Sequence, residues 1–325
     1  MASRYIISVD LGGTKILAAL LNPQNKIIYR VKIPTEIKKG KAYLIQSVAH
    51  SVKKILSDKK LSEREIKSIC VGVPGTVNPE TGIIGRAPNL GIVNFNIKEA
   101  LAKKIKIPVL IENDVNLAGL GILRAELRNK AKNMLVVFVG TGIGGALFFD
   151  GKLYRGSNFY AGEIGHMRVG SKGNIAFSRD SSTIELSASR TAIVREIKKE
   201  LSGNKKSILK EYKSPKKTLK SRALAEAVKK GDKLAVKHVS KAARILGTSL
   251  GSITTLLNID TIVLGGGVIE AMHKFMIPLI KSSFKESVLP EPGKFVKIYE
   301  TKLGDDAPLY GGIPLAEEFL GAIKR

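Results

Sequence analysis

The fold is decided by two similar stretches, Tyr5-Ile-Ile-Ser-Val-Asp10-Leu-Gly-Gly-Thr-Lys15 and Met134-Leu-Val-Val-Phe-Val-Gly140-Thr-Gly-Ile-Gly-Gly145. Each begins with a short apolar run rich in β-branched residues, which indicates a buried strand. Each then passes through a glycine- and threonine-containing turn, after which apolar residues resume at 16–21 and 146–149. Both stretches therefore predict a strand, a tight turn and a second strand.

The two turns are typical of sites that hold anionic oxygens. Glycines let successive backbone N–H groups point into one concavity, and threonine adds a hydroxyl. A third apolar run, Ile262-Val-Leu-Gly265-Gly-Gly267, also ends in glycines. None of these places has Gly-x-Gly-x-x-Gly before a helix or a P-loop Gly-Lys-Ser/Thr, which argues against dinucleotide-binding and P-loop folds. The pattern favours a polyphosphate site of the sugar-kinase type.

Composition narrows the class of protein. A chain of 325 residues with 44% apolar residues can bury a large core and would normally form two domains. No apolar run reaches the length of about 20 residues that a membrane helix needs, and no secretory signal precedes the first strand. The single cysteine, Cys70, excludes an intrachain disulfide and is expected to be buried. We therefore expect a cytoplasmic protein without a membrane partner.

The net charge of +26 raises the possibility of nucleic-acid binding. The lysines are, however, spread along expected helical faces, and only residues 204–220 concentrate them. We interpret that segment as a solvated loop or helix face. We expect no specific nucleic-acid partner.

Periodicity predicts an ordered series of elements. We expect strands at 5–9, 66–73, 108–111, 134–139, 146–154, 261–264 and 295–300, and a hairpin over 16–31. Helices are expected at 41–58, 97–104, 115–129, 183–201, 221–230, 232–257, 270–286 and from residue 310, and 76–96 is expected to be rich in loops. The repeated strand-turn units suggest an internal duplication, with a ligand bound between two lobes.

The motifs resemble those of the ROK family (repressors, open reading frames, kinases) in the actin/hexokinase-like superfamily. They occur in the family's order: Asp10-Leu-Gly-Gly-Thr-Lys15, Val71-Gly-Val-Pro-Gly75, Ala87-Pro-Asn-Leu-Gly91, Glu112-Asn-Asp-Val-Asn116, Gly140-Thr-Gly-Ile-Gly-Gly145, Ala161-Gly-Glu-Ile-Gly-His166 and Leu264-Gly-Gly-Gly-Val268. The resemblance implies a two-lobed α/β, actin-like (ribonuclease H-like) ATPase fold with an interlobe cleft. It assigns 1–115 and about 306–325 to the first lobe and 116–305 to the second.

The resemblance also implies an activity, ATP-dependent phosphorylation of a hexose, with glucose and its 6-hydroxyl expected first. Asp114 matches the family's base, which accepts the proton of the reacting hydroxyl. From the residues alone, the position of Asp114 favours a helix cap, because Asp and Asn are preferred at such positions. Phosphoryl transfer does need one group that orients the nucleophile and takes its proton.

Other residues match the family's sugar contacts. Buried sugar hydroxyls need polar partners, since an unpaired buried donor costs about 1–3 kcal/mol. A histidine such as His166 is often structural, but its place after Gly-Glu-x-Gly favours a functional role. Gly75 is expected to let the backbone approach the ligand. By resemblance the sugar-binding residues are Gly75, Asn89, Asn113, Asp114, Glu163, His166 and Glu185.

The nucleotide half follows in the same way. Asp10 matches the carboxylate that engages Mg²⁺ through water, and a single carboxylate is enough because magnesium keeps waters and phosphates as ligands. Lys15 either reaches phosphate or lies on the surface. The expected ATP contacts are Asp10, Gly12, Gly13, Thr14, Lys15, Thr141, Gly142, Gly144 and Gly145, with Gly265, Gly266 and Gly267 under the nucleoside.

The chain departs from the family after His166. Many ROK proteins bind a structural zinc there with three cysteines and the histidine, whereas the matching positions here are Ala176, Ser178 and Thr183. None of these can supply a thiolate, so we expect no zinc site. Glu185 is retained, and the loop at 170–182 would need other support.

Three alternatives to a glucokinase remain. A ROK transcriptional repressor carries a winged helix-turn-helix domain before the first glycine turn, for which the sequence before Asp10 leaves no room. A silent sugar sensor would not need both Asp10 and Asp114. A kinase for an N-acetylhexosamine, fructose, mannose or allose shares all these motifs.

The family also implies a homodimer formed by the second lobe. A two-lobed kinase must keep water from the γ-phosphate, so we expect the lobes to close over the sugar at hinges near 113–118 and 304–310.

Overall fold

The computed structural model describes residues 5–170, 182–203, 205–214 and 216–322. The chain divides into two compact units. The first contains Met1–Ala131, Gly151–Ala161 and Asp305–Arg325, and the second contains Lys132–Asp150 and Gly162–Gly304. Residues 116–131 and 151–161, which the sequence analysis assigned to the second lobe, pack within the first unit.

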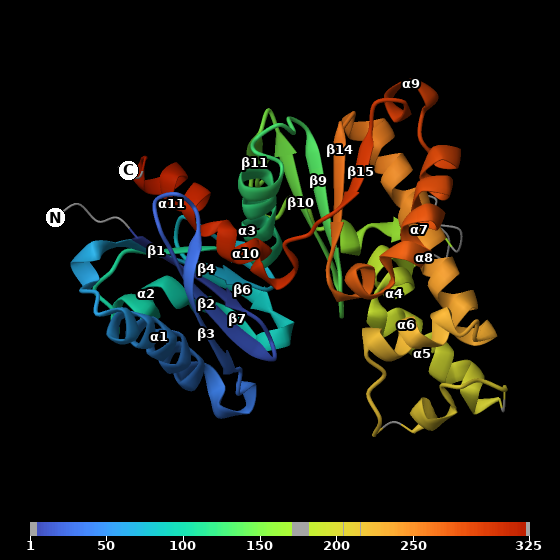
Figure 1. Ribbon diagram of the computed structural model, residues 1–325, viewed down its shortest axis with the longest axis horizontal. Coiled ribbons are helices and arrows are strands. Elements are labelled where there is room, and N and C mark those ends of the chain that lie inside the picture. The colour runs from blue at the N-terminus through green and yellow to red at the C-terminus, as the bar shows by residue number, and fades with distance from the viewer. Residues whose placement is uncertain (1–4, 171–181, 204, 215, 323–325) are drawn as a thin grey trace. The chain divides into compact units, whose positions relative to one another are not determined.

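The first unit is built on a mixed sheet with strand order β3-β2-β1-β4-β8 (Figure 1). The pairs β1–β2 and β2–β3 are antiparallel, and β1–β4 and β4–β8 are parallel. A second, antiparallel sheet has the order β5-β6-β7. It occupies the stretch that we expected to be rich in loops, and its short strands gave no clear alternation. The strands are β1 (Tyr5–Leu11), β2 (Lys15–Leu21), β3 (Ile27–Pro34), β4 (Ile66–Val73), β5 (Thr76–Asn78), β6 (Ile83–Ala87), β7 (Ile92–Asn96) and β8 (Val109–Asn113), and this unit also contains the short strand β11 (Lys152–Tyr154).

Helices cover both faces of the main sheet of this unit. Apolar residues of α1 join the core on the face that carries Ile7 and Val9. On the other face Ser8 Oγ donates to the Pro308 carbonyl oxygen, and the buried Cys70 Sγ lies 3.1 Å from the Gly312 carbonyl oxygen. The helices of this unit are α1 (Gly40–Lys59), α2 (Ile97–Ala102), α3 (Asp114–Gly121), α10 (Ala307–Tyr310) and α11 (Gly312–Leu320).

Two glycines bring α3 and α10 into backbone contact. A Cβ atom on Gly121 would lie 2.0 Å from the Ala307 carbonyl oxygen, and one on Gly311 would lie 1.9 Å from the Leu117 carbonyl oxygen. No larger residue fits at either position without moving a helix. The predicted helix over 115–129 is shorter than expected, because after Gly121 the chain forms a π-helical turn, Ile122–Glu126.

The second unit contains β10, β9, β14 and β15 of a five-stranded mixed sheet with the order β11-β10-β9-β14-β15. Strands β9 and β10 are antiparallel, whereas β9, β14 and β15 are parallel. Both units therefore start with a hairpin and add parallel strands beside its first strand, as an internal duplication predicts. The strands are β9 (Met134–Val139), β10 (Ile143–Phe149), β14 (Thr261–Gly265), β15 (Lys297–Glu300) and the short pair β12 (Arg168–Val169) and β13 (Ser182–Thr183).

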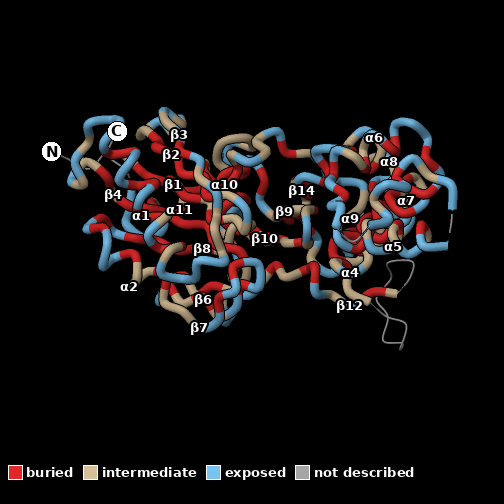
Figure 2. Tube along the Cα trace, turned by 90° about the horizontal axis from the view of Figure 1, so that it is seen from below, coloured by how far each residue is buried: buried red, intermediate tan, exposed pale blue. Residues whose placement is uncertain are grey.

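The helices of the second unit carry most of its apolar core, and Figure 2 shows the central strands of each unit as buried. The helix expected at 183–201 is two helices, because Ser189 is extended and caps the second of them through its hydroxyl. The helices are α4 (Ile184–Ala188), α5 (Arg190–Ser202), α6 (Ser221–Lys229), α7 (Lys233–Leu257), α8 (Gly267–Ser287) and α9 (Pro290–Gly293). The 3₁₀ turns are Ile37–Lys39, Glu63–Glu65, Pro88–Leu90, Ile164–His166, Lys210–Lys213 and Gly304–Asp306.

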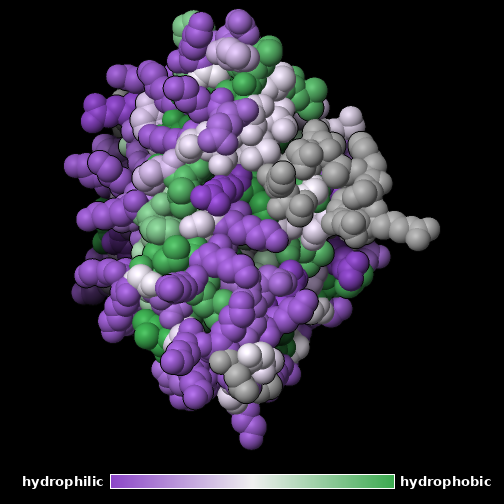
Figure 3. Space-filling view, turned by 90° about the vertical axis from the view of Figure 1, so that its right-hand side faces the viewer, coloured by the Kyte–Doolittle hydropathy of each residue, from purple (hydrophilic) through white to green (hydrophobic). Residues whose placement is uncertain are grey.

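The positive charge is distributed over the surface. Figure 3 shows the hydropathy of one face of the molecule, where hydrophilic side chains are interspersed with apolar ones. The described lysines of the 204–220 segment are all exposed, and Lys205 and Lys217 pair with Glu200 and Glu211. Among the described residues, no helix is both long and apolar enough to span a membrane.

Candidate functional site

In the first unit the predicted residues gather where three parallel strands end. The strand register places Asp10 of β1 beside Gly72 of β4, and Gly72 beside Glu112 of β8. Gly72 lets the next helix approach, since a Cβ atom there would lie 3.3 Å from Asp114 Cα. The carboxyl ends of parallel strands are where α/β proteins place their ligands.

Asn113 and Asp114 form the corner between β8 and α3. Asn113 is the N-cap of α3, and its Oδ1 accepts from the N–H groups of Val115 and Asn116 at 2.9 and 3.0 Å. Asp114 is the first residue of the helix, and its Oδ1 accepts from the Val115 N–H at 2.9 Å. Because Asn113 supplies the cap, capping does not by itself account for the carboxylate at 114.

Asp10 lies in an environment that opposes its ionisation. Burial raises the pKa of its carboxyl from 3.8 to about 7, and the charges of Asp114 and Asp305 add to the rise while Lys15 opposes it. The carboxylates at this corner thus outnumber the cations close to Asp10. Such an excess of oxygen donors suits a hard divalent cation.

The first glycine turn lies against the predicted sugar loop. The Gly12 N–H donates to the Lys15 carbonyl oxygen at 3.0 Å and closes the turn. A Cβ atom on Gly13 would lie 3.2 Å from the Asn89 carbonyl oxygen, so the two segments are close. Thr14 is exposed. The Lys15 ammonium forms an ion pair with the Asp305 carboxylate, so in this structure its charge is neutralised by another residue of the protein.

Gly75 is needed for its conformation. Its φ is +98°, and a Cβ atom would lie 2.2 Å from the Arg86 carbonyl oxygen. Its own carbonyl oxygen accepts from Asn113 Nδ2 at 3.0 Å. This bond joins the predicted sugar-binding glycine to the β8–α3 corner and uses one of the two Asn113 amide hydrogens.

In the second unit the glycine turn is held by the start of α5. The Gly140 N–H donates to the Gly142 carbonyl oxygen at 2.9 Å. Arg190 Nη2 donates to Thr141 Oγ1 at 2.6 Å, and Thr191 Oγ1 donates to the Thr141 carbonyl oxygen at 2.7 Å. Arg190 was not among the residues predicted for the site. In the sequence it was one of several cations inside the helix predicted at 183–201, and nothing local linked it to the turn.

Glu185 also lies on this turn. Its Oε2 accepts from the Ile143 N–H at 2.8 Å, and a Cβ atom on Gly142 would lie 2.3 Å from the same oxygen. We expected Glu185 to contact a sugar, and the structure shows that one of its oxygens is engaged by the backbone. Its other carboxylate oxygen, Oε1, is not part of this bond.

Glu163 and His166 follow on a loop packed against β10. Gly145 and Gly162 permit this packing, since a Cβ atom on either would lie within 2.6 Å of the other's carbonyl oxygen. Burial raises the pKa of Glu163, His166 lowers it and Glu185 raises it, so the three groups share one electrostatic environment with a net upward shift. His166 Nε2 is 3.9 Å from Glu163 Oε2, and the histidine side chain is 73% exposed.

The third glycine run forms the junction of β14 and α8. Gly266 is the N-cap of α8 with a φ of +85°, and a Cβ atom there would lie 2.7 Å from the Val139 carbonyl oxygen. Gly265 is buried, and Gly267 is exposed at the first position of the helix. Backbone N–H groups are therefore presented beside the end of β9.

Of the positions compared with the zinc motif, Ala176 and Ser178 lie outside the described residues, as does most of the loop at 170–182. Thr183 caps α4, and its Oγ1 accepts from the Leu186 N–H at 3.1 Å. Among the residues that the structure describes, no three His, Cys, Asp or Glu side chains are grouped to hold a metal.

Known proteins similar to this chain are kinases and regulators. The ROK family model matches residues 6–318. The chain is 33% identical over 313 residues to a glucokinase of Halalkalibacterium halodurans, which covers 96% of this chain and 94% of the relative. A ROK family glucokinase from Streptomyces griseus, solved in complex with glucose and AMPPNP, superposes with a TM-score of 0.80 at 25% identity and covers 97% of this chain and 99% of its own.

A xylose repressor of Caldicellulosiruptor bescii is 24% identical over 310 residues, which cover 95% of this chain and 77% of the repressor. The predicted fold class is confirmed, because two mixed sheets, one in each unit, match these actin-like ATPase structures. With a family model matched over nearly its whole length and a glucokinase as a 33% identical relative, the chain belongs to the ROK family.

Proposed function

We propose that this protein is an ATP-dependent hexose kinase that transfers the γ-phosphate to the 6-hydroxyl of glucose, with Asp114 as the base. One observation carries the proposal most: the Asp114 carboxylate lies at the start of α3 and interacts electrostatically with the half-buried Asp10 carboxylate, where β1 and β8 end. The glucokinase from Halalkalibacterium halodurans supports the choice of substrate.

The proposed reaction makes one bond and breaks one. Asp114 accepts the proton of the 6-hydroxyl as its oxygen attacks the γ-phosphorus. The bond from that phosphorus to the β,γ-bridging oxygen breaks, and ADP leaves. A loose phosphoryl transition state demands positioning and charge neutralisation more than covalent chemistry, and a fixed carboxylate at a helix start supplies the first.

The nucleotide would be held by both glycine turns. The N–H groups of Gly12 and Ile143 are bonded within the protein. Other backbone N–H groups of 12–14 and 142–145 and the hydroxyls of Thr14 and Thr141 suit phosphate oxygens, and 265–267 would lie under the nucleoside. Asp10 would hold Mg²⁺ through water. The excess of carboxylates over cations around Asp10 fits that assignment. When bound, the cation would neutralise charge on the phosphates.

The sugar hydroxyls would be bound by the residues that match the family's sugar contacts. In the first unit these are Asn89, the remaining Asn113 amide hydrogen and the Gly75 backbone. In the second they are Glu163, His166 and Glu185 Oε1, the oxygen that does not accept from the Ile143 N–H. The exposure of His166 leaves its ring accessible to a ligand.

A coupled ADP-release assay over glucose, fructose, mannose, allose, N-acetylglucosamine and N-acetylmannosamine tests the proposal. We expect the highest kcat/KM for glucose. Turnover of N-acetyl sugars alone would refute the glucokinase assignment but keep the kinase. No turnover of any sugar would refute the kinase and favour a regulator.

We also propose a homodimer formed by the second unit, as the family resemblance implies. Closed two-fold dimers are the commonest oligomers. The exposed lysines of 204–220 would oppose pairing wherever they face each other. Light scattering at physiological salt should give twice the chain mass, and a monomeric mass would refute the dimer.

A further inference from the structure

Glu112, which precedes the proposed base by two residues, is a buried carboxylate, and one of its oxygens contacts the β8–α3 corner. Its side chain is 1% exposed. Oε1 accepts from the Asn113 N–H at 2.9 Å and from Asn116 Nδ2 at 3.0 Å. One oxygen thus holds the backbone of the cap residue and a side chain on the first turn of α3.

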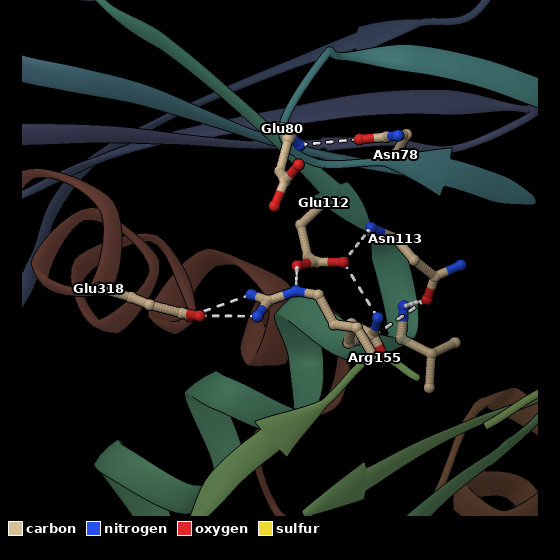
Figure 4. Close-up of polar contacts among 8 residues, drawn as sticks. Asn78, Glu80, Glu112, Asn113, Arg155 and Glu318 are labelled. Carbon is tan, nitrogen blue, oxygen red and sulfur yellow. Dashed lines mark hydrogen bonds and ion pairs between the residues drawn. The ribbon is translucent and has the colours of Figure 1, made fainter. Parts of the chain in front are cut away.

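The other oxygen of Glu112 is held by Arg155. Arg155 Nε donates to Glu112 Oε2 at 2.7 Å, and the arginine side chain is only 11% exposed. Figure 4 shows the guanidinium between two carboxylates, Glu112 and Glu318. Burial lowers the pKa of Arg155, but the hydrogen bonds and charges of Glu318 and Glu112 outweigh this and raise it overall. The arginine is therefore a permanent cation.

The far side of the guanidinium is held by the C-terminal helix. Arg155 Nη1 and Nη2 donate to the two Glu318 oxygens at 2.6 and 3.0 Å, which is a bidentate pair. The guanidinium also lies 5.6 Å from the centre of the Phe319 ring. Three segments far apart in the sequence, β8–α3, the residues after β11 and α11, therefore meet at one arginine, and all three belong to the first unit.

We propose that Arg155 is a positioning residue, which fixes the orientation of Glu112 and through it the Asn113–Asp114 corner, while Glu318 fixes Arg155. The role in catalysis rests on the proposed function of Asp114. The role in geometry does not, because it concerns hydrogen bonds that exist without any substrate.

The physical reason lies in how the donors are divided. Glu112 Oε1 can accept from both the Asn113 N–H and Asn116 Nδ2 only while the carboxylate keeps one rotamer. Arg155 sets that rotamer by fixing Oε2. Its rigid planar fork binds Glu112 through Nε and Glu318 through both Nη atoms, a fixed geometry that a lysine ammonium does not provide. Without Arg155 a buried carboxylate loses its cation, so it rotates or draws in water, and the corner shifts. A displacement of about 1 Å at a reacting group can cost about 100-fold in rate.

The variant Arg155→Met removes the fork and keeps the apolar length of the side chain. We expect kcat to fall about 10- to 100-fold, with KM for ATP and glucose changed less than about threefold. The control is Arg124→Met, which breaks the ion pair between Arg124 and Glu317. Glu317, like Glu318, lies on α11, but its ion pair with Arg124 does not include Glu112. The control therefore weakens the anchoring of α11 without releasing Glu112, and kcat should stay within about twofold of wild type.

A double variant separates positioning from packing. Glu112→Gln alone should be harmful, because its amide N–H₂ would face the Arg155 N–H. In Arg155→Met/Glu112→Gln the glutamine oxygen can still accept from Asn113 and Asn116, and no buried charge remains. We expect its kcat to exceed that of Arg155→Met by about five- to tenfold, a coupling typical of contacting groups. If the kcat loss of the double variant equals the product of the losses of the two single variants, the proposal is overturned.

A measurement without substrate keeps the two proposals distinguishable. Hydrogen–deuterium exchange of the peptide over 109–118 should speed up at least about tenfold in Arg155→Met and stay at the wild-type rate in Arg124→Met. If both variants exchange alike, Arg155 has no positioning role, whatever the kinetics. If wild type turns over no sugar but the exchange differs as expected, the kinase assignment fails and the positioning stands.

Discussion

Replacing Gly142 with alanine would place a methyl group against a carboxylate of the candidate site. The new Cβ would lie 2.3 Å from Glu185 Oε2 and 3.1 Å from Glu185 Cδ. Carbon atoms in favourable contact are about 3.5–4.0 Å apart, so the carboxylate must swing away. The buried Ile143 N–H then loses the acceptor that it now has at 2.8 Å.

The cost follows from that lost bond. A buried donor left unpaired costs about 1–3 kcal/mol, whereas a Gly-to-Ala change gains about 0.4–1 kcal/mol by restricting the unfolded chain. Gly140, in the same turn, is a matched control, because nothing lies within 4 Å of its Cβ position. The entropic gain is common to both variants, so Gly142→Ala should be less stable than Gly140→Ala by about 1–3 kcal/mol.

Urea unfolding of both variants measures this difference. The same substitution in a Glu185→Ala background removes the overlap, so there Gly142→Ala should carry no penalty relative to Gly140→Ala. Equal stability of the two variants, or an unchanged penalty without the Glu185 carboxylate, would refute the reasoning. If Glu185 also binds the sugar, KM for glucose should rise in Gly142→Ala and not in Gly140→Ala.

Four further predictions concern the site. Asp114→Asn should lower kcat by about 10²–10⁴-fold, as loss of a general base does, with KM for ATP unchanged; wild-type kcat in steady-state assays would contradict this. Arg190→Ala should raise KM for ATP about five- to tenfold and leave KM for glucose alone, because the cation is held at the Thr141 hydroxyl; equal effects on both substrates would count against a nucleotide role. Because the folded-state pKa of Asp10 is raised from 3.8 to about 7, the fold loses stability as pH rises between those values, by at most about 4 kcal/mol. In metal-free buffer the free energy of unfolding of Asp10→Asn, measured in urea, should therefore rise relative to that of wild type from pH 5 to 8. A difference in stability that is constant over this pH range would disprove the pKa shift. Chelation should abolish activity until Mg²⁺ is added, and elemental analysis should find no stoichiometric zinc; one zinc per chain would show that other ligands replace the missing thiolates.

Elements with strong local signals were predicted well. The strand at 66–73 has the predicted bounds, and the predicted helix at 41–58 is α1, Gly40–Lys59. Errors fell where neighbours override local preference. The π-helical turn after Gly121 follows the close approach of α10 to α3, and no single segment of sequence encodes that approach. The strands of β5–β7 were missed because each is short and stabilised by its partners.

At the glycine turns, too, the local sequence predicted the turn itself but not the residues that pack against it. Their sequences predicted hairpins with exposed backbone donors, and the structure has a hairpin at each of the first two. That Asn89 lies against the first turn and Glu185 against the second depends on loops distant in the chain. The assignments of these residues to sugar and nucleotide were drawn from family resemblance and remain predictions.

By itself, the sequence determined the α/β class, the repeated strand-turn unit and the family, because periodicity and short motifs depend on near neighbours. It also predicted the residues around which a kinase site would be built. Only the tertiary structure decided which charges those residues meet. Arg155 reaches Glu112 and Glu318 across 43 and 163 positions of the chain, Arg190 reaches Thr141 across 49, and Lys15 is paired with Asp305. Such pairings depend on how sheets and helices pack in space, and the local sequence around a charged residue does not predict its partner.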